Sequence, residues 1–219
     1  MLVPTVTLAG DFSCNTPLIA HENPNIVKGD FSASVKFDAV KFAPTMVGFG
    51  GTGGRAQEIT IADGTLFLVK DEGGTLRIRH KADNGEGAVV LVVGAPMAWK
   101  AFGKSDGANS FDGLEFLLDS AVEDMKCDDN ARLPFKIVAH ANSVTWSGAD
   151  GPDKDKIITS KDVDVMVVGI YSKTDKERLH MVRGYNLHAH VVIPGQDVAG
   201  HVNDIDLQDG GTLYLPATR

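Results

Sequence analysis

The sequence predicts an α+β fold that is rich in antiparallel or mixed β-sheet and contains few helices. Over many short segments, hydrophobic residues alternate with polar ones, which is the period of a half-buried strand. Hairpin-type turn signals, Asp63-Gly64 and Gly73-Gly74, separate some of these segments. One stretch, residues 111–125, places hydrophobic residues at helical spacing instead. We expect a β-rich N-terminal half over residues 1–105 and an α+β C-terminal half over residues 106–219.

The strands of the N-terminal half are expected to form a meander. Residues 33–40 alternate in hydrophobicity, and residues 58–80 read as three strands joined by two tight turns. Residues 88–94, AVVLVVG, form the continuous apolar run of a strand that is buried on both faces. Residues 48–53, GFGGTG, match Gly-x-Gly-x-x-Gly, but a strand pattern follows where a dinucleotide-binding motif needs a helix. We interpret these glycines as flexible backbone near a site.

The helix is expected to begin after Ser110, whose hydroxyl group is suited to cap it. After the helix, residues 135–146, 164–172 and 187–193 and the segment GTLYLPA near the C-terminus are strand-like. The most polar stretch, SGADGPDKDK, is expected to be a loop.

Composition and charge limit the classes of function. The chain has 219 residues, of which 43% are hydrophobic, and this is enough for a buried core. A formal net charge of -8 without a cluster of Lys and Arg argues against nucleic acid or an anionic membrane as the main partner. We expect a small-molecule substrate, and we consider a homodimer as well as a monomer.

The apolar runs and the two cysteines bear on the compartment. No apolar run is long enough to cross a bilayer, and the N-terminus lacks the basic start of a secretory signal, so we expect a cytoplasmic protein. Cys14 and Cys127 have no neighbours at the spacing of a zinc motif, and we expect both to be ordinary thiols.

Three of the seven histidines gather in residues 186–204. In a strand, His188 and His190 share one face with their Cα atoms about 6.5 to 7 Å apart. The turn PGQDVAG returns the chain, and a symmetric hairpin places His201 opposite His190 and Asn203 opposite His188. Three histidines on a rigid sheet suit a catalytic metal site with an open position, and unrelated histidines are the alternative. The other four are expected at the surface or in local hydrogen bonds: His21, His80, His140 and His180.

Residues 184–210, GYNLHAHVVIPGQDVAGHVNDIDLQDG, resemble the C-terminal signature of the α-acetolactate decarboxylase family. That signature combines His-x-His, a ten-residue interval, Gly-His-Val and a short acidic strand. Residues 51–69 are similar to the family's glycine-led strand with its metal-binding glutamate, in register with Glu58. The resemblance covers most of residues 45–215 and implies two similar α+β halves. It also implies a divalent ion, with zinc preferred, held by four residues: Glu58, His188, His190 and His201.

The activity that the resemblance implies is that of a metal-dependent carbon-carbon lyase of the decarboxylase type. Its substrate would be a small 2-hydroxy-3-oxo acid or a related oxo compound, and the metal would stabilise an enediolate. A hydrolase or isomerase using the same site, or a non-catalytic metal-binding or ligand-binding protein, remains an alternative. A cupin-like barrel is disfavoured because no acidic residue follows His190 at the cupin spacing.

The sequence departs from the family's pattern in two places. The family carries an arginine on the strand pair after the helix, which helps to hold the substrate and to supply a proton, but no arginine occurs between Arg132 and Arg178. The family also continues to a late glutamate that reaches the site, whereas this sequence ends at Arg219. We expect another residue, such as Arg183, to complete catalysis together with Glu58. The other substitutes that we consider are Arg55, Lys154 and Lys156.

Overall fold

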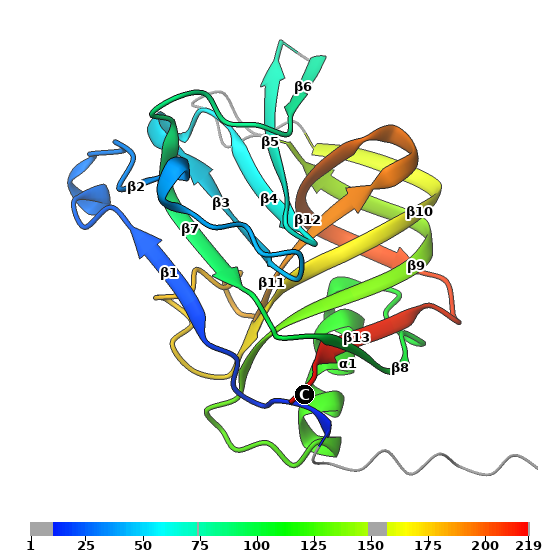
Figure 1. The fold of residues 1–219 in the computed structure, drawn as a ribbon. Coiled ribbons are helices and arrows are strands. Elements are labelled where there is room, and N and C mark those ends of the chain that lie inside the picture. The colour runs from blue at the N-terminus through cyan, green and yellow to red at the C-terminus, as the bar shows by residue number, and fades with distance from the viewer. Residues whose placement is uncertain (1–10, 74, 149–156, 219) are drawn as a thin grey trace, which may run out of the picture.

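Two antiparallel β-sheets pack against each other in the computed structural model, which describes residues 11–73, 75–148 and 157–218 (Figure 1). The first sheet is built from the N-terminal part of the chain and the second from the C-terminal part. The N-terminal residues 1–10, and all of the expected loop except Ser147 and Gly148, lie outside the described residues.

The first sheet has the strand order β1-β7-β3-β4-β5-β6, and β2 also pairs with β7. The three strands predicted for residues 58–80 are confirmed as β4, β5 and β6, and the turn at Asp63-Gly64 joins the first two; Gly74, in the second predicted turn, lies outside the described residues. The glycine-rich residues 48–52 are not a flexible loop but belong to β3, in the middle of the sheet. The strands of this sheet are β1 (Leu18–Glu22), β2 (Val35–Lys36), β3 (Val47–Thr52), β4 (Glu58–Ala62), β5 (Thr65–Glu72), β6 (Thr75–Arg79) and β7 (Gly87–Gly94).

The strand expected over residues 33–40 is mostly wrong. Only Val35 and Lys36 pair with β7, and Phe37–Ala39 form a 3₁₀ turn. This turn buries the Phe37 ring against the core of the first sheet, where it is 4% exposed. Burial of one large ring therefore overrides an alternating pattern that has no strand partner beyond Lys36.

The second sheet has the strand order β10-β11-β12-β9-β13-β8, and β9 also pairs with β10. The long, bent strand β9 therefore closes a ring with β10, β11 and β12. Strand β8 pairs with β13, so the chain passes from the first sheet to the second between Gly94 and Trp99. The strands are β8 (Trp99–Lys104), β9 (Arg132–Ser147), β10 (Ile157–Ser172), β11 (Leu187–Ile193), β12 (Val198–Leu207) and β13 (Thr212–Pro216).

An ion pair links the two sheets. Lys136 on β9 donates hydrogen bonds to both carboxylate oxygens of Asp63, in the turn between β4 and β5, at 2.9 Å each. The Lys136 side chain is 13% exposed and the Asp63 side chain 35%, so solvent screens this pair only in part. Lys136 stands opposite Val168 on β10, and Val168 stands opposite His190 on β11. The same row of the second sheet therefore carries the inter-sheet link and a histidine.

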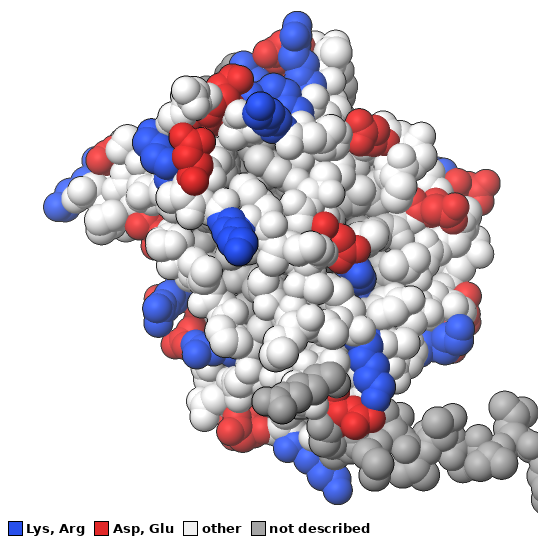
Figure 2. Space-filling model, in the orientation of Figure 1, with Lys and Arg blue, Asp and Glu red and all other residues white. Residues whose placement is uncertain are grey.

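The charged surface is mixed. Lysine and arginine side chains are interspersed with aspartate and glutamate side chains on the face that Figure 2 shows. No helix in the described part of the chain is long and apolar enough to span a membrane.

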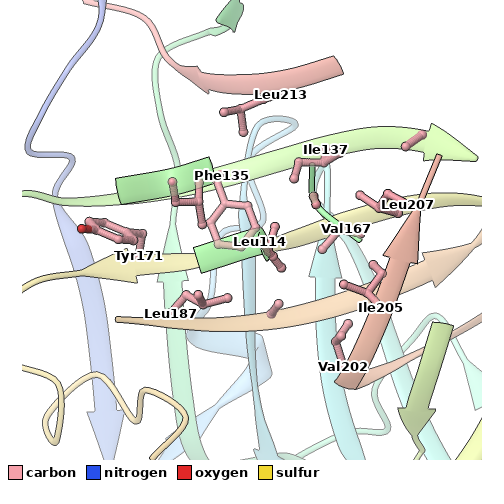
Figure 3. Packing of buried hydrophobic residues seen from close by; sticks show 14 of the residues in the cluster. Leu114, Phe135, Ile137, Val167, Tyr171, Leu187, Val202, Ile205, Leu207 and Leu213 are labelled. Atoms are coloured by element: carbon pink, nitrogen blue, oxygen red, sulfur yellow. The ribbon is translucent and has the colours of Figure 1, made fainter. Parts of the chain in front are cut away.

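The single α-helix that the sequence predicts is confirmed as α1 (Phe111–Asp124). The Ser110 hydroxyl oxygen accepts a hydrogen bond from the Gly113 amide at 3.0 Å and caps the helix as expected. One face of α1, including Leu114 and Leu118, packs on the inner side chains of the second sheet (Figure 3). Every residue that Figure 3 labels is at most 3% exposed, so α1 completes a fully buried core.

The two cysteines form a disulfide, so the prediction of ordinary thiols is wrong. The segment around Cys14 runs beside the start of β9, where the Arg132 amide donates to the Cys14 carbonyl oxygen. Cys127 lies in the turn that leads from α1 to the same strand, and the two Cα atoms are 5.5 Å apart. The cysteines are separated by 113 positions in the sequence, so no local motif could indicate their pairing.

We expect the disulfide to stabilise the fold substantially. Replacing Cys14 and Cys127 with Ser should lower the free energy of unfolding by about 2 to 5 kcal/mol, because the bridge closes a long loop in the unfolded chain. Equilibrium urea unfolding followed by circular dichroism measures this difference, with the reduced wild-type protein as the matched control. Equal unfolding energies for the oxidised protein and the variant would contradict the expectation.

Candidate metal centre

Three histidines converge where the β11–β12 hairpin faces the first sheet. His190 stands opposite His201, as the sequence predicts. The His188 Nε2 and His201 Nδ1 atoms are 2.9 Å apart, and one ligand atom from each of the three rings lies within 4.8 Å of the others. The predicted pairing of Asn203 with His188 is wrong. Beyond His201, β12 follows β9 instead of β11, and the Asn203 side chain donates to the Ser147 hydroxyl at 3.3 Å.

Groups from outside the hairpin hold the rings in place. The His188 Nδ1 atom donates to the His180 carbonyl oxygen at 2.6 Å, which leaves Nε2 free of its proton and able to bind a metal. The His190 Nδ1 atom is 2.7 Å from the Thr60 hydroxyl on β4. Phe49 on β3 stacks on His188 with ring centroids 3.7 Å apart. Two of the three rings are therefore oriented by the first sheet.

Burial keeps the three rings neutral. It lowers the pKa of His188 to about 3 and that of His201 to about 4, and it lowers the pKa of His190 well below its ordinary value. Repulsion from neighbouring imidazoles lowers the pKa of His188 and His190 further. At neutral pH all three rings are in the uncharged form that binds metal ions.

The residues present fit a divalent metal ion. The His190 Nε2 atom is buried and has no hydrogen-bond partner among the described residues, a state that costs about 1 to 3 kcal/mol. The Glu58 Oε1 atom lies 3.4 Å from it. Three neutral imidazoles beside a carboxylate make a donor set typical of zinc sites. Glu58 lies outside the compact group of three, and its role as a fourth ligand remains a prediction.

A cavity of about 380 Å³ opens beside His188. Phe49, Gly51 and Glu58 line it from the first sheet, and His180 and His188 line it from the second half of the chain. Arg55 reaches the same cavity from the turn after β3, and its guanidinium carbon lies 4.3 Å from the centre of the Phe31 ring. His188 and Glu58 therefore face a space that can hold a small molecule.

The residues that we considered as substitutes for the family's arginine differ in their position relative to the cavity. Arg55 and Arg183 are both exposed, but of the two only Arg55 is among the described residues that line the cavity. Lys154 and Lys156 lie outside the described residues. The catalytic role of Arg183 thus remains a prediction that its position does not support.

Three of the remaining histidines are placed as expected. His140 bonds Asp162 and Asp164 at the surface, His80 bonds Asp197, and His21 is exposed on β1. His180 differs, because it contributes its carbonyl oxygen to His188 and its ring to the cavity wall. It lies in an irregular turn with a positive φ of 55°, so no periodic pattern in the sequence could indicate either role.

Comparison with known proteins shows the fold. No protein-family model matches the chain, and no curated protein sequence matches it. The α-acetolactate decarboxylase of Bacillus subtilis strain 168 has a TM-score of 0.69 and 15% identity, and the acetolactate decarboxylase of Bacillus subtilis subspecies spizizenii has 0.68 and 16%. A Staphylococcus aureus protein of unknown function, similar to α-acetolactate decarboxylase, has 0.68 and 12%.

Each of these similarities covers 92% of this chain and 86% of the other chain. The chain has the acetolactate decarboxylase-like α+β fold, which confirms the fold class and the resemblance inferred from the sequence. At such low identity the similarity shows the fold and leaves the activity to be argued from the site.

We expect the purified protein to carry about one divalent ion per chain, with zinc preferred. The double variant His188→Ala/His190→Ala should lose the ion, and Glu58→Gln should bind it about tenfold or more weakly if the carboxylate is a ligand. Elemental analysis and competition with a chromophoric chelator measure these effects. His140→Ala, which removes an exposed histidine, is the matched control. Wild-type metal content in the double variant would refute the site, and unchanged affinity in Glu58→Gln would remove Glu58 from it.

Proposed function

We propose that this protein is a metal-dependent carbon-carbon lyase of the decarboxylase type, acting on a small 2-hydroxy-3-oxo acid or a related oxo compound. The observation that carries this proposal is the group of three neutral histidines beside a cavity, in which the His190 Nε2 atom has no hydrogen-bond partner within residues 11–73, 75–148 and 157–218. A divalent ion bound there would act as a Lewis acid on adjacent substrate oxygens and stabilise the negative charge that develops as carbon dioxide leaves. The fold shared with acetolactate decarboxylases supports the same reaction class.

Arg55 is the residue best placed to bind the carboxylate of such a substrate. It is the one lysine or arginine among the described residues that line the cavity. The guanidinium plane can bind a carboxylate through two hydrogen bonds, and the Phe31 ring limits its motion. We therefore assign to Arg55 the role that the sequence left to Arg183.

Glu58 is the residue that we propose as the proton donor to the substrate. Its carboxylate faces the cavity and lies 3.4 Å from His190 Nε2, at the edge of the histidine group. A carboxyl group in this position can return a proton to the carbon that loses carbon dioxide. Phe49, Val89 and Val90 give the cavity an apolar wall, which strengthens such polar contacts by excluding water.

The disulfide bears on the compartment in which the protein works. The sequence favours the cytoplasm, where glutathione and thioredoxin keep most thiols reduced. The Cys14–Cys127 bridge therefore counts against a cytoplasmic location and favours an oxidising compartment.

We expect slow turnover of acetolactate. The family's arginine is absent from the strand pair after the helix, and loss of one preorganised donor typically lowers the rate about a hundredfold. The rate of acetoin and carbon dioxide formation should lie well below about 10 per second, fall to background with a chelator and return with zinc. Acetoin formation at an ordinary enzymatic rate would show that Arg55 fully replaces the family's arginine.

The alternatives give different results in parallel assays. Metal-dependent hydrolysis of an ester or lactone without loss of carbon dioxide would favour a hydrolase at the same site. An absence of turnover with zinc, for 2-hydroxy-3-oxo acids and esters alike, would favour a non-catalytic metal-binding or ligand-binding protein.

Arg55 and Arg183 can be compared directly. Arg55→Gln should lower kcat/KM about a hundredfold while metal content stays unchanged, because the variant loses the charge that binds the substrate carboxylate. Arg183→Gln, the matched control, should change kcat/KM by less than about twofold because this side chain is exposed and outside the cavity wall. The opposite ranking of the two variants would restore Arg183 as the functional arginine.

A further inference from the structure

The cavity floor follows one row of directly paired residues across the first sheet. Glu22 on β1 pairs with Val90 on β7, Val90 pairs with Gly51 on β3, and Gly51 pairs with Glu58 on β4. Directly opposed residues point to the same face of a sheet, and all four of these residues line the cavity. Because neighbouring strands are about 4.8 Å apart, the backbone at Glu22 lies roughly 14 Å from that at Glu58. The cavity is therefore elongated, with Glu22 at one end and Glu58, which lies 3.4 Å from His190 Nε2, at the other.

Gly51 keeps the middle of this row open. A Cβ atom at this position would meet only the Val89 Cγ1 atom, at 3.9 Å, within a radius of 4 Å. Its φ is not positive, so a side chain would cause no backbone strain there. Because Gly51 has no side chain, the cavity is continuous from Glu58 to Glu22.

The far end carries an incomplete polar pair. The His180 Nε2 atom lies 3.6 Å from the Glu22 Oε2 atom, which is beyond a hydrogen bond. This nitrogen is buried and has no hydrogen-bond partner in the described part of the chain. The Glu22 side chain is 41% exposed, so its carboxylate is accessible to a ligand. Both residues line the cavity.

A hydroxyl group matches this pair. Its hydrogen can be donated to the Glu22 carboxylate while its oxygen accepts a hydrogen bond from the His180 Nε2–H group. A methyl or methylene group in the same place would leave the buried nitrogen unsatisfied. The backbone of His180 has a positive φ of 55°, a strained conformation that is often found at functional sites.

We propose that His180 and Glu22 bind a hydroxyl group at the far end of the substrate, so that the substrate is a hydroxylated acid longer than acetolactate. This inference rests on the proposed function, because it takes the oxygens at the other end of the substrate to be held at the metal centre. It names a substrate class that the metal centre alone does not distinguish.

Two acids that differ in one terminal hydroxyl group test the proposal: 2-hydroxyhexanoate and 2,6-dihydroxyhexanoate. With the zinc-loaded protein, isothermal titration calorimetry should give about tenfold or greater tighter binding of the dihydroxy acid. Glu22→Ala and His180→Asn should each remove this preference. Asn tolerates a positive φ and keeps the backbone carbonyl that supports His188, but its side chain is shorter. His21→Ala, a change at the neighbouring exposed residue of β1, is the matched control and should keep the preference.

Gly51→Val provides an independent test. The added side chain should project into the middle of the cavity and weaken binding of 2,6-dihydroxyhexanoate about tenfold, while binding of glycolate, a short 2-hydroxy acid, stays unchanged. Equal affinity of the wild-type protein for the two six-carbon acids would overturn the proposal. A preference that survives in both Glu22→Ala and His180→Asn would overturn it as well.

Metal content separates direct binding from an effect through His188. His180→Asn should keep wild-type zinc content by elemental analysis, and a loss of zinc would show that His180 acts only by supporting His188. The binding preference does not depend on turnover. If it is present in a protein that decarboxylates no 2-hydroxy-3-oxo acid, the lyase proposal falls and the hydroxyl site stands. If the protein decarboxylates such an acid but shows no preference for the dihydroxy acid, the lyase proposal stands and the hydroxyl site falls.

Discussion

The candidate metal centre depends on the close packing of one row of the second sheet against the first sheet. His190 and Lys136 belong to this row, and each contacts a residue of the other sheet, Thr60 and Asp63 respectively. The Lys136 side chain is nearly buried and Asp63 is about one third exposed, so a change in the spacing of the sheets would separate charges that water screens only in part. The same spacing sets how far Glu58 lies from the histidines. Inter-sheet packing thus determines the geometry of the ligands as well as the stability of the core.

Much of the fold was predictable because its signals are local. The helix after Ser110, the hairpins of residues 58–80 and the pairing of His190 with His201 all follow from spacing within short segments. Where the chain departs from simple alternation, a tertiary contact is the cause. The Phe37 ring enters the core and ends β2 after two residues, and β12 leaves β11 for β9 beyond His201. Such contacts are formed by segments that the sequence does not place together.

The histidine group was predictable, but its surroundings were not. The three ligands lie within one hairpin, whereas Thr60 and Phe49 come from strands more than a hundred positions earlier in the chain. His180 is close to His188 in sequence, yet it acts through a backbone carbonyl, for which any residue type is adequate. The disulfide likewise joins distant positions. Residue types can indicate a ligand set, but the groups that orient the ligands become visible only in three dimensions.

The double use of His180 has a thermodynamic consequence. Its carbonyl oxygen orients His188, a candidate metal ligand, and the residue also lines the cavity, so one short turn would take part in both proposed binding events. If occupation of the cavity orders this turn, the metal must be held more tightly by the same factor by which the metal improves binding in the cavity. Reciprocity of this kind makes metal retention and ligand binding a single linked equilibrium. The affinity of the centre for its ion is then a property of the occupied protein as much as of its three histidines.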